Sequence, residues 1–170
     1  MIYEFARGDH KFDLRLGRAG VELLHLRVTG LRDRLRGVLF TAAHDGARLE
    51  FVVAAPWNGK LFRVRSEGID VATARRFRKG PLGVANYTIQ AAGREFLLEA
   101  TDEQGTDFRL SEGGAACGGW GIGAFSDVRD WHSELDVPDG LDLRVVAFLA
   151  FLIGDGRRRL EIARPSRRGQ

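Results

Sequence analysis

Cysteine and lysine are scarce in this 170-residue chain, and both shortages narrow its chemistry. The single cysteine, Cys117, excludes a disulfide within the chain and a cysteine-rich zinc site, and it fits a reducing compartment. Only three of the 26 basic residues are lysines, so arginine, the better bidentate partner for phosphate and carboxylate, supplies most of the positive charge. A genomic base composition that favours arginine, glycine and alanine together is the alternative explanation.

We expect neither a membrane-spanning segment nor a secretory signal. The apolar stretch Val145–Ile153 has nine residues, whereas a membrane crossing needs about 20. Residues 1–9 contain no basic segment followed by an apolar one, as a signal peptide would require. We therefore expect a cytoplasmic protein that is peripheral to the membrane if it binds one.

Motifs for catalysis or metal binding are absent as well. No two histidines have the helical i,i+4 spacing, and none lies beside a carboxylate cluster at ligand spacing. The glycine-rich run 113–123 lacks both the Gly-Lys-Ser/Thr of a P-loop and the following helix of a dinucleotide site. Its glycines instead predict tight bends and close backbone approach, and Cys117 is interpreted as a buried or semi-buried small residue. We expect no enzymatic activity and no cofactor.

Two-residue alternation of apolar and polar side chains dominates the first two thirds of the chain. It runs through residues 12–16, 47–53 and 62–65, and it indicates strands with one face in a core. Asn58-Gly59 predicts a hairpin turn, and a second one is predicted at Ala92-Gly93-Arg94. Eleven or twelve short strands favour a barrel or a sandwich. No linker interrupts the pattern, which predicts one domain over residues 1–164 and a disordered basic tail over 165–170.

Residues 143–153 break this alternation and predict a helix of about twelve residues. Asp139 is the predicted N-cap, Asp142 a first-turn acid, and Gly154 the C′ residue. The segment is apolar on all sides, so it must be buried, and we predict a barrel wrapped around it. Residues 157–163 are predicted to form a last strand. The central helix positions are Leu143, Val146, Phe148, Leu149, Phe151 and Leu152.

The sequence before this helix carries a family resemblance. Phe125-Ser126-Asp127-Val128-Arg129-Asp130-Trp131 is followed by Leu135-Asp136-Val137-Pro138 and by Leu141-Asp142. Residues 120–154 thereby resemble the C-terminal part of phospholipid scramblases and, equally, the LURP-one-related proteins and their bacterial relatives. These families are grouped with the tubby C-terminal domain, and the similarity is weaker but collinear over residues 47–110. It implies a closed β-barrel of about twelve antiparallel strands around a central hydrophobic C-terminal helix.

One departure from the scramblase pattern concerns calcium. Scramblases have an acidic segment before the helix with aspartates two residues apart. Here Asp127 matches the first of them, but Arg129 stands at the position of the second. A cation at this position opposes a calcium site, so we expect no metal and retain Asp127 and Asp130 only as weak candidates.

Clustered arginines are the strongest candidates for binding. Tubby domains bind phosphoinositide headgroups on a basic barrel face, so the resemblance implies that these side chains hold anionic lipid, with solvated surface charge as the alternative. The few aromatic residues near them form no stacking platform, and nucleic acid is not expected. The headgroup candidates are Arg75, Arg76, Arg78, Lys79, Arg63, Arg65, Arg32, Arg34 and Arg36.

These observations together predict a non-enzymatic intracellular binding module of the LURP-one-related or scramblase-like type. Its expected partner is an anionic membrane surface or another protein. A scramblase-like lipid mover and a protein–protein adaptor are the alternatives, because a shared fold does not by itself define a function.

Overall fold

The computed structural model describes residues 1–7, 14–27, 38–44, 47–54, 61–79, 84–102, 107–121 and 132–163. Within these residues the chain forms twelve strands and one helix, which confirms the mostly β class with a C-terminal helix. The strands are β1 (Ile2–Arg7), β2 (Leu14–Arg18), β3 (Val21–Arg27), β4 (Val38–His44), β5 (Ala47–Ala54), β6 (Leu61–Ser66), β7 (Ile69–Lys79), β8 (Val84–Ala91), β9 (Arg94–Ala100), β10 (Asp107–Glu112), β11 (Ala115–Gly121) and β12 (His132–Asp136). The helix is α1 (Leu143–Ala163).

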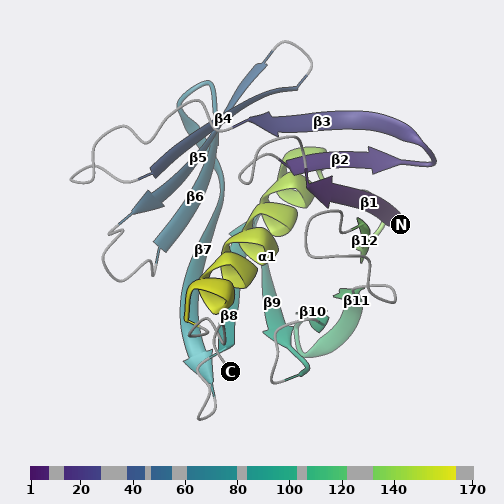
Figure 1. The fold of residues 1–170 in the computed structure, drawn as a ribbon, viewed down its shortest axis with the longest axis vertical. Helices are drawn as coiled ribbons and strands as arrows, with labels where there is room; N and C mark the ends of the chain where they lie inside the picture. The colour runs from purple at the N-terminus through teal and green to yellow at the C-terminus, as the bar shows by residue number, and fades with distance from the viewer. Residues whose placement is uncertain are drawn as a thin grey trace, which may run out of the picture.

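The strands pair in the order in which they occur in the sequence. Each pairs antiparallel with its sequence neighbours, and β1 pairs with both β2 and β12, so the order of pairing returns to its start (Figure 1). The junctions differ in length: β3 and β4 are aligned over two residue pairs, whereas β4 and β5 are aligned over seven. This up-and-down order requires no crossover connection.

Two-residue turns join four of the described hairpins. Both residues of each turn have positive φ, which is the type I′ geometry that matches the twist of the flanking strands. Glycine at the second position of every turn adopts this conformation without Cβ strain. The predicted turn at Ala92-Gly93 is therefore confirmed, whereas Asn58-Gly59 lies outside the described residues. The turns are Ala19-Gly20, Glu67-Gly68, Ala92-Gly93 and Gly113-Gly114.

Alternation along the strands places one set of side chains in a common core. On β6, Phe62 and Val64 are buried between less buried neighbours, and on β9 the predicted inward pair Phe96 and Leu98 is buried. These side chains belong to one cluster of buried hydrophobic residues that includes α1. Each buried phenylalanine or leucine contributes about 1.5–3 kcal/mol of transfer free energy.

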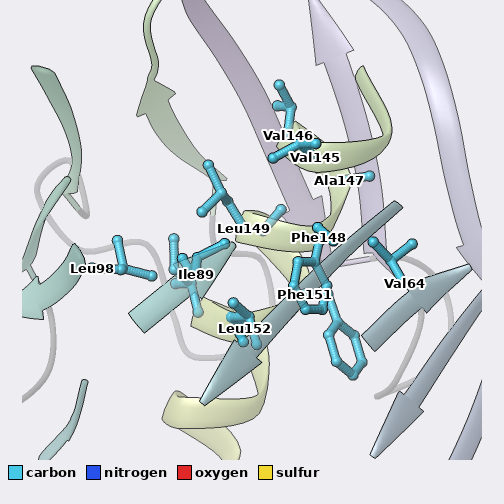
Figure 2. Close-up of a cluster of buried hydrophobic side chains, with 14 of the residues drawn as sticks. Val64, Ile89, Leu98, Val145, Val146, Ala147, Phe148, Leu149, Phe151 and Leu152 are labelled. Atoms are coloured by element: carbon cyan, nitrogen blue, oxygen red, sulfur yellow. The ribbon is translucent and has the colours of Figure 1, made fainter. Parts of the chain in front are cut away.

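Helix α1 is enclosed on every side along its apolar segment. The nine consecutive residues Val145–Ile153 are all buried, and nine residues cover the full circumference of a helix. Figure 1 shows α1 passing between β7 and β9, and Figure 2 shows Phe148 and Leu152 among side chains from the surrounding strands. The Phe151 ring lies 5.1 Å from that of Phe51 on β5. Among the predicted central positions, Leu143 alone is half-buried, because it lies in the first turn.

The predicted end of the helix was wrong. α1 does not stop at Gly154 but continues to Ala163, and the predicted last strand over 157–163 is helical. Glycine inside a helix costs about 1 kcal/mol, which is too little to end a helix whose earlier turns are held by packing. The following arginines and Leu160 favour helix. No helix in the described residues is long and apolar enough to cross a membrane.

The helix begins at Leu143 as predicted, but its predicted N-cap was wrong, because Asp142 and not Asp139 caps it. The Arg144 backbone N–H donates to Asp142 Oδ1 at 2.8 Å, and the Val146 N–H donates to the Asp142 carbonyl oxygen at 3.1 Å. Gly140 has positive φ and forms a turn that separates Asp139 from the helix. The Asp139 carboxylate lies instead 3.3 Å from the Met1 amino nitrogen.

Two glycines of β11 explain part of the glycine-rich run. A Cβ atom on Gly118 would overlap the Asp136 carbonyl group, at 2.9 Å from its carbon, and one on Gly119 would lie 2.7 Å from the Phe108 carbonyl oxygen. Glycine at these positions therefore allows the backbones of β10, β11 and β12 to approach closely. Over residues 113–121 the interpretation of these glycines as structural is confirmed.

Candidate functional site

Two of the predicted arginines lie on the outer surface of β6. Arg63 and Arg65 alternate along this strand with the buried residues Phe62, Val64 and Ser66. Because successive side chains on a strand point to opposite faces, both guanidinium groups point away from the core. Their side chains remain 36% and 35% exposed, so solvent and solutes reach both.

A carboxylate that sequence reasoning missed joins these two arginines. Arg65 Nε donates to Asp70 Oδ1 at 2.7 Å, and Arg63 Nη1 donates to Asp70 Oδ2 at 3.4 Å. Asp70 lies near the start of β7, just after the Glu67-Gly68 turn, and its side chain is 38% exposed. The sequence does place Asp70 shortly after the alternating arginines Arg63 and Arg65. Whether its carboxylate reaches them depends on the register between β6 and β7, which the sequence does not specify.

The register between β6 and β7 contains an irregularity that selects Asp70. Val64 aligns with Ala72, and the next aligned pair is Arg65 with Asp70, so Val71 is the extra residue of a β-bulge. In a regular ladder Arg65 would align with Val71 instead. The bulge therefore places a carboxylate, and not an apolar side chain, beside the two arginines.

The dense basic segment on β7 does not form one cluster. Arg75 is exposed, but Arg76 is only 7% exposed and aligns with the buried Tyr87 of β8. Because successive side chains on a strand point to opposite faces, Arg75 and Arg76 lie on opposite sides of the sheet. The prediction that Arg76 is a headgroup-binding residue on the outer surface was therefore wrong. The strand ends at Lys79, and the side chains of Arg78 and Lys79 lie outside the described residues.

Arg75 differs from Arg63 and Arg65 in its surroundings. Its strand neighbours are the uncharged residues Leu61 on β6 and Thr88 on β8. Among the described residues it takes part in no ion pair. Arg75 is thus the guanidinium on this surface that can meet an external anion without displacing a carboxylate.

Strand β5 adds a further pair of charges. Arg48 Nη2 lies 3.4 Å from Glu50 Oε1, and Glu50 aligns with Arg65 on the neighbouring strand. The Arg48 backbone N–H donates to Glu67 Oε1 at 3.1 Å. We refer to the outer side chains Arg48, Arg63, Arg65 and Arg75 as the arginine face; the carboxylates interspersed with them are Glu50, Glu67 and Asp70.

The outer surface of β9 and β10 has the opposite balance of charge. Arg109 Nη2 lies 3.3 Å from Glu99 Oε2, and Arg94 pairs with Glu112 at the ends of these strands. The other two charged side chains of β9 and β10, Glu95 and Asp107, are exposed carboxylates. Positive charge therefore exceeds negative charge on β5–β7 but not on β9–β10. An anionic partner would favour the arginine face over this second surface.

The other predicted site residues cannot be placed relative to this face. Arg32, Arg34 and Arg36 lie outside the described residues, as do Asp127, Arg129 and Asp130. Within the part of the chain that the structure describes, no group of three or more histidine, cysteine or acidic side chains could hold a metal ion.

Cys117 lies near the ion pair of Arg94 and Glu112. The register shifts between Leu110 and Ser111, so Cys117 is the extra residue of a bulge in β11, and it is half-buried as expected. Burial raises the pKa of its thiol, and the nearby Glu112 carboxylate raises it further. A raised pKa reduces the thiolate fraction at neutral pH, so this thiol is a poor nucleophile.

Fold and site together define a mostly antiparallel β protein with an apolar C-terminal helix and an arginine face on β5–β7. The chain has no significant match among family models, curated proteins or solved structures.

Proposed function

We propose that this chain is a non-enzymatic binding module whose arginine face binds anionic phospholipid headgroups. The observation that carries the proposal is the position of Arg63, Arg65 and Arg75 on one exposed outer surface of two paired strands. Each arginine near an anionic membrane contributes about 1 kcal/mol of binding free energy. Arg75 supports the proposal most directly, because it has no partner to displace among the described residues.

We also propose the fold family to which this binding module belongs. A closed barrel of the tubby C-terminal kind, related to scramblases and LURP-one-related proteins, is supported by the cyclic order of strand pairing and by the enclosed apolar segment of α1. The resemblance over residues 120–154 supports it independently. In this interpretation the helix fills the interior of the barrel, and the lipid headgroup binds to the arginine face on the outer surface.

Co-sedimentation with vesicles tests the proposal. The wild-type chain is expected to bind phosphatidylcholine vesicles that contain an anionic lipid and not vesicles of phosphatidylcholine alone. Binding should weaken at high salt, because screening shortens the range of charge–charge attraction. Arg75→Gln is expected to weaken binding about fivefold, which corresponds to ~1 kcal/mol.

Arg109→Gln is the matched control. It makes the same change in net charge on the outer surface of β10, where the arginine is paired with Glu99. We expect it to bind acidic vesicles nearly as well as the wild-type chain. Equal losses in the two variants would show a non-specific charge effect, and absence of binding to every acidic vesicle would overturn the proposal and favour a protein partner.

A further inference from the structure

Strand β7 carries an exposed apolar side chain near each of its ends. Ile69, its first residue, is 72% exposed, and Phe77, close to its end at Lys79, is 36% exposed. The extended strand between them separates the two side chains by about 25 Å. The two ends of β7 can therefore contact different partners, and the charges around each end determine which partner that is.

Phe77 lies on the same outer surface as Arg75. Arg76 between them is only 7% exposed, so alternation along the strand places Arg75 and Phe77 together on the opposite side, about 7 Å apart. Their aligned partners on β8 are the uncharged residues Thr88 and Asn86. Within the described residues no carboxylate is aligned with either side chain, so this end of β7 attracts an anionic surface.

Ile69 has the opposite surroundings. It follows the Glu67-Gly68 turn and directly precedes Asp70, and the side chains of Glu67 and Asp70 are both exposed. Carboxylates this close in the chain repel an anionic surface. Ile69 is therefore the more exposed of the two apolar side chains but the less suited to an anionic partner.

We propose that Phe77 inserts into the boundary between headgroups and acyl chains of an anionic bilayer when Arg75 binds the headgroups. Peripheral membrane proteins combine apolar side chains at this depth with cationic side chains at the level of the headgroups. A headgroup free in solution offers no apolar phase to the ring, so the inference names the lipid surface itself as the partner. It rests on the proposed function and adds a second, apolar contribution to the same contact.

Phe77→Ser removes the apolar contribution and leaves every charge in place. We would measure its binding to vesicles of phosphatidylcholine and phosphatidylserine at low and at high salt. The variant should bind about fivefold more weakly than the wild-type chain, since it loses the transfer of the exposed part of the ring out of water. This factor should be similar at both salt concentrations, whereas the effect of Arg75→Gln should shrink at high salt, because salt screens charges and does not weaken apolar burial.

Ile69→Ser is the matched control because it removes a more exposed apolar side chain from the same strand. It should bind the vesicles as the wild-type chain does. Circular dichroism and thermal melting of both variants verify that the fold is retained. An equal loss of binding in both variants would overturn the inference, since any exposed apolar side chain would then have the same effect.

A fluorescence measurement tests insertion without removing the apolar side chain. Phe77→Trp places an indole at the proposed depth, and Ile69→Trp places one at the other end of the strand. With phosphatidylserine-containing vesicles whose acyl chains are brominated, Phe77→Trp should show more quenching than the wild-type chain, and Ile69→Trp should not. Equal quenching of the wild-type chain and Phe77→Trp would contradict insertion of this side chain.

The outcomes separate this inference from the proposed function. If Phe77→Ser binds acidic vesicles as the wild-type chain does while Arg75→Gln binds them more weakly, the contact is purely electrostatic. That result would refute the role of Phe77 and leave the binding module intact. If the wild-type chain binds no acidic vesicle at either salt concentration, the proposed function itself is refuted, and the insertion of Phe77 with it.

Discussion

Inside the sheet, α1 presents nine consecutive buried residues, whereas on the arginine face every guanidinium is in contact with solvent. The interior packs apolar side chains from many strands around one helix, so each position depends on its neighbours. The arginine face consists of side chains that interact in pairs through partly screened charges.

This difference in packing indicates that the arginine face tolerates substitution better than the interior does. A change inside must satisfy packing on every side, while a change outside alters mainly charge and the choice of partner. A binding function on the arginine face can therefore change without loss of the fold. The three predictions below compare the effect of substitutions at buried and at exposed positions.

The largest effect is expected from a charge placed in the interior. Phe148→Asp would bury a carboxylate among apolar side chains, at a cost of about 5 kcal/mol or more, which is comparable with the whole stability of a domain. We expect the variant to be unfolded by circular dichroism and to show no cooperative melting. Phe77→Asp, the same substitution at an exposed position of β7, should stay folded and lose about 1 kcal/mol. A folded Phe148→Asp variant would contradict the enclosed helix.

A smaller loss of stability is expected where the backbones of β11 and β12 approach closely. Gly118→Ala places a Cβ against the Asp136 carbonyl, so β11 and β12 must separate, and we expect a loss of about 3 kcal/mol in urea unfolding. Gly154→Ala makes the same substitution in α1, where the added methyl group has open space. It should stabilise the protein by about 0.5–1 kcal/mol. Equal changes in the free energy of unfolding of the two variants would contradict the close approach of the β11 and β12 backbones.

The smallest effect concerns an exposed ion pair. Arg94 donates two hydrogen bonds of 2.7 Å to Glu112, and this contact lowers the pKa of the Glu112 carboxyl below its ordinary value of 4.5. The stabilisation is therefore complete above pH 4.5 and is lost as the pH falls through the lower folded pKa. The melting temperatures of wild type and Glu112→Gln should differ slightly at pH 6 and converge toward pH 3. A difference that grows on acidification would reverse the assigned sign.

Local pattern was sufficient to predict the strands and the buried helix. Alternation in β6 and β9 and nine uninterrupted apolar residues in α1 each determine burial through their own periodicity. The N-cap and the C-terminal end of the helix were harder to predict, because Asp139 and Asp142 are equally good capping residues and Gly154 permits either continuation or termination. Packing of the preceding turns and the turn at Gly140 decided between them.

The candidate site was predictable only in part, because the sequence identifies the arginines but does not specify the register between β6 and β7. Arginine content identified Arg63, Arg65 and Arg75, and two-residue periodicity could have separated Arg75 from Arg76. Nothing in the sequence specified that the ladder would shift by one residue at Arg65 and bring Asp70 beside two guanidinium groups.

The sequence by itself determined the strand content, the buried helix and the arginine-rich character of the chain, because these depend on the order of apolar and polar residues along a short segment. Tertiary structure alone decided which arginines share a surface and which carboxylates neutralise them. Strand register and bulges bring together residues from different strands, and charge pairing acts across those strands.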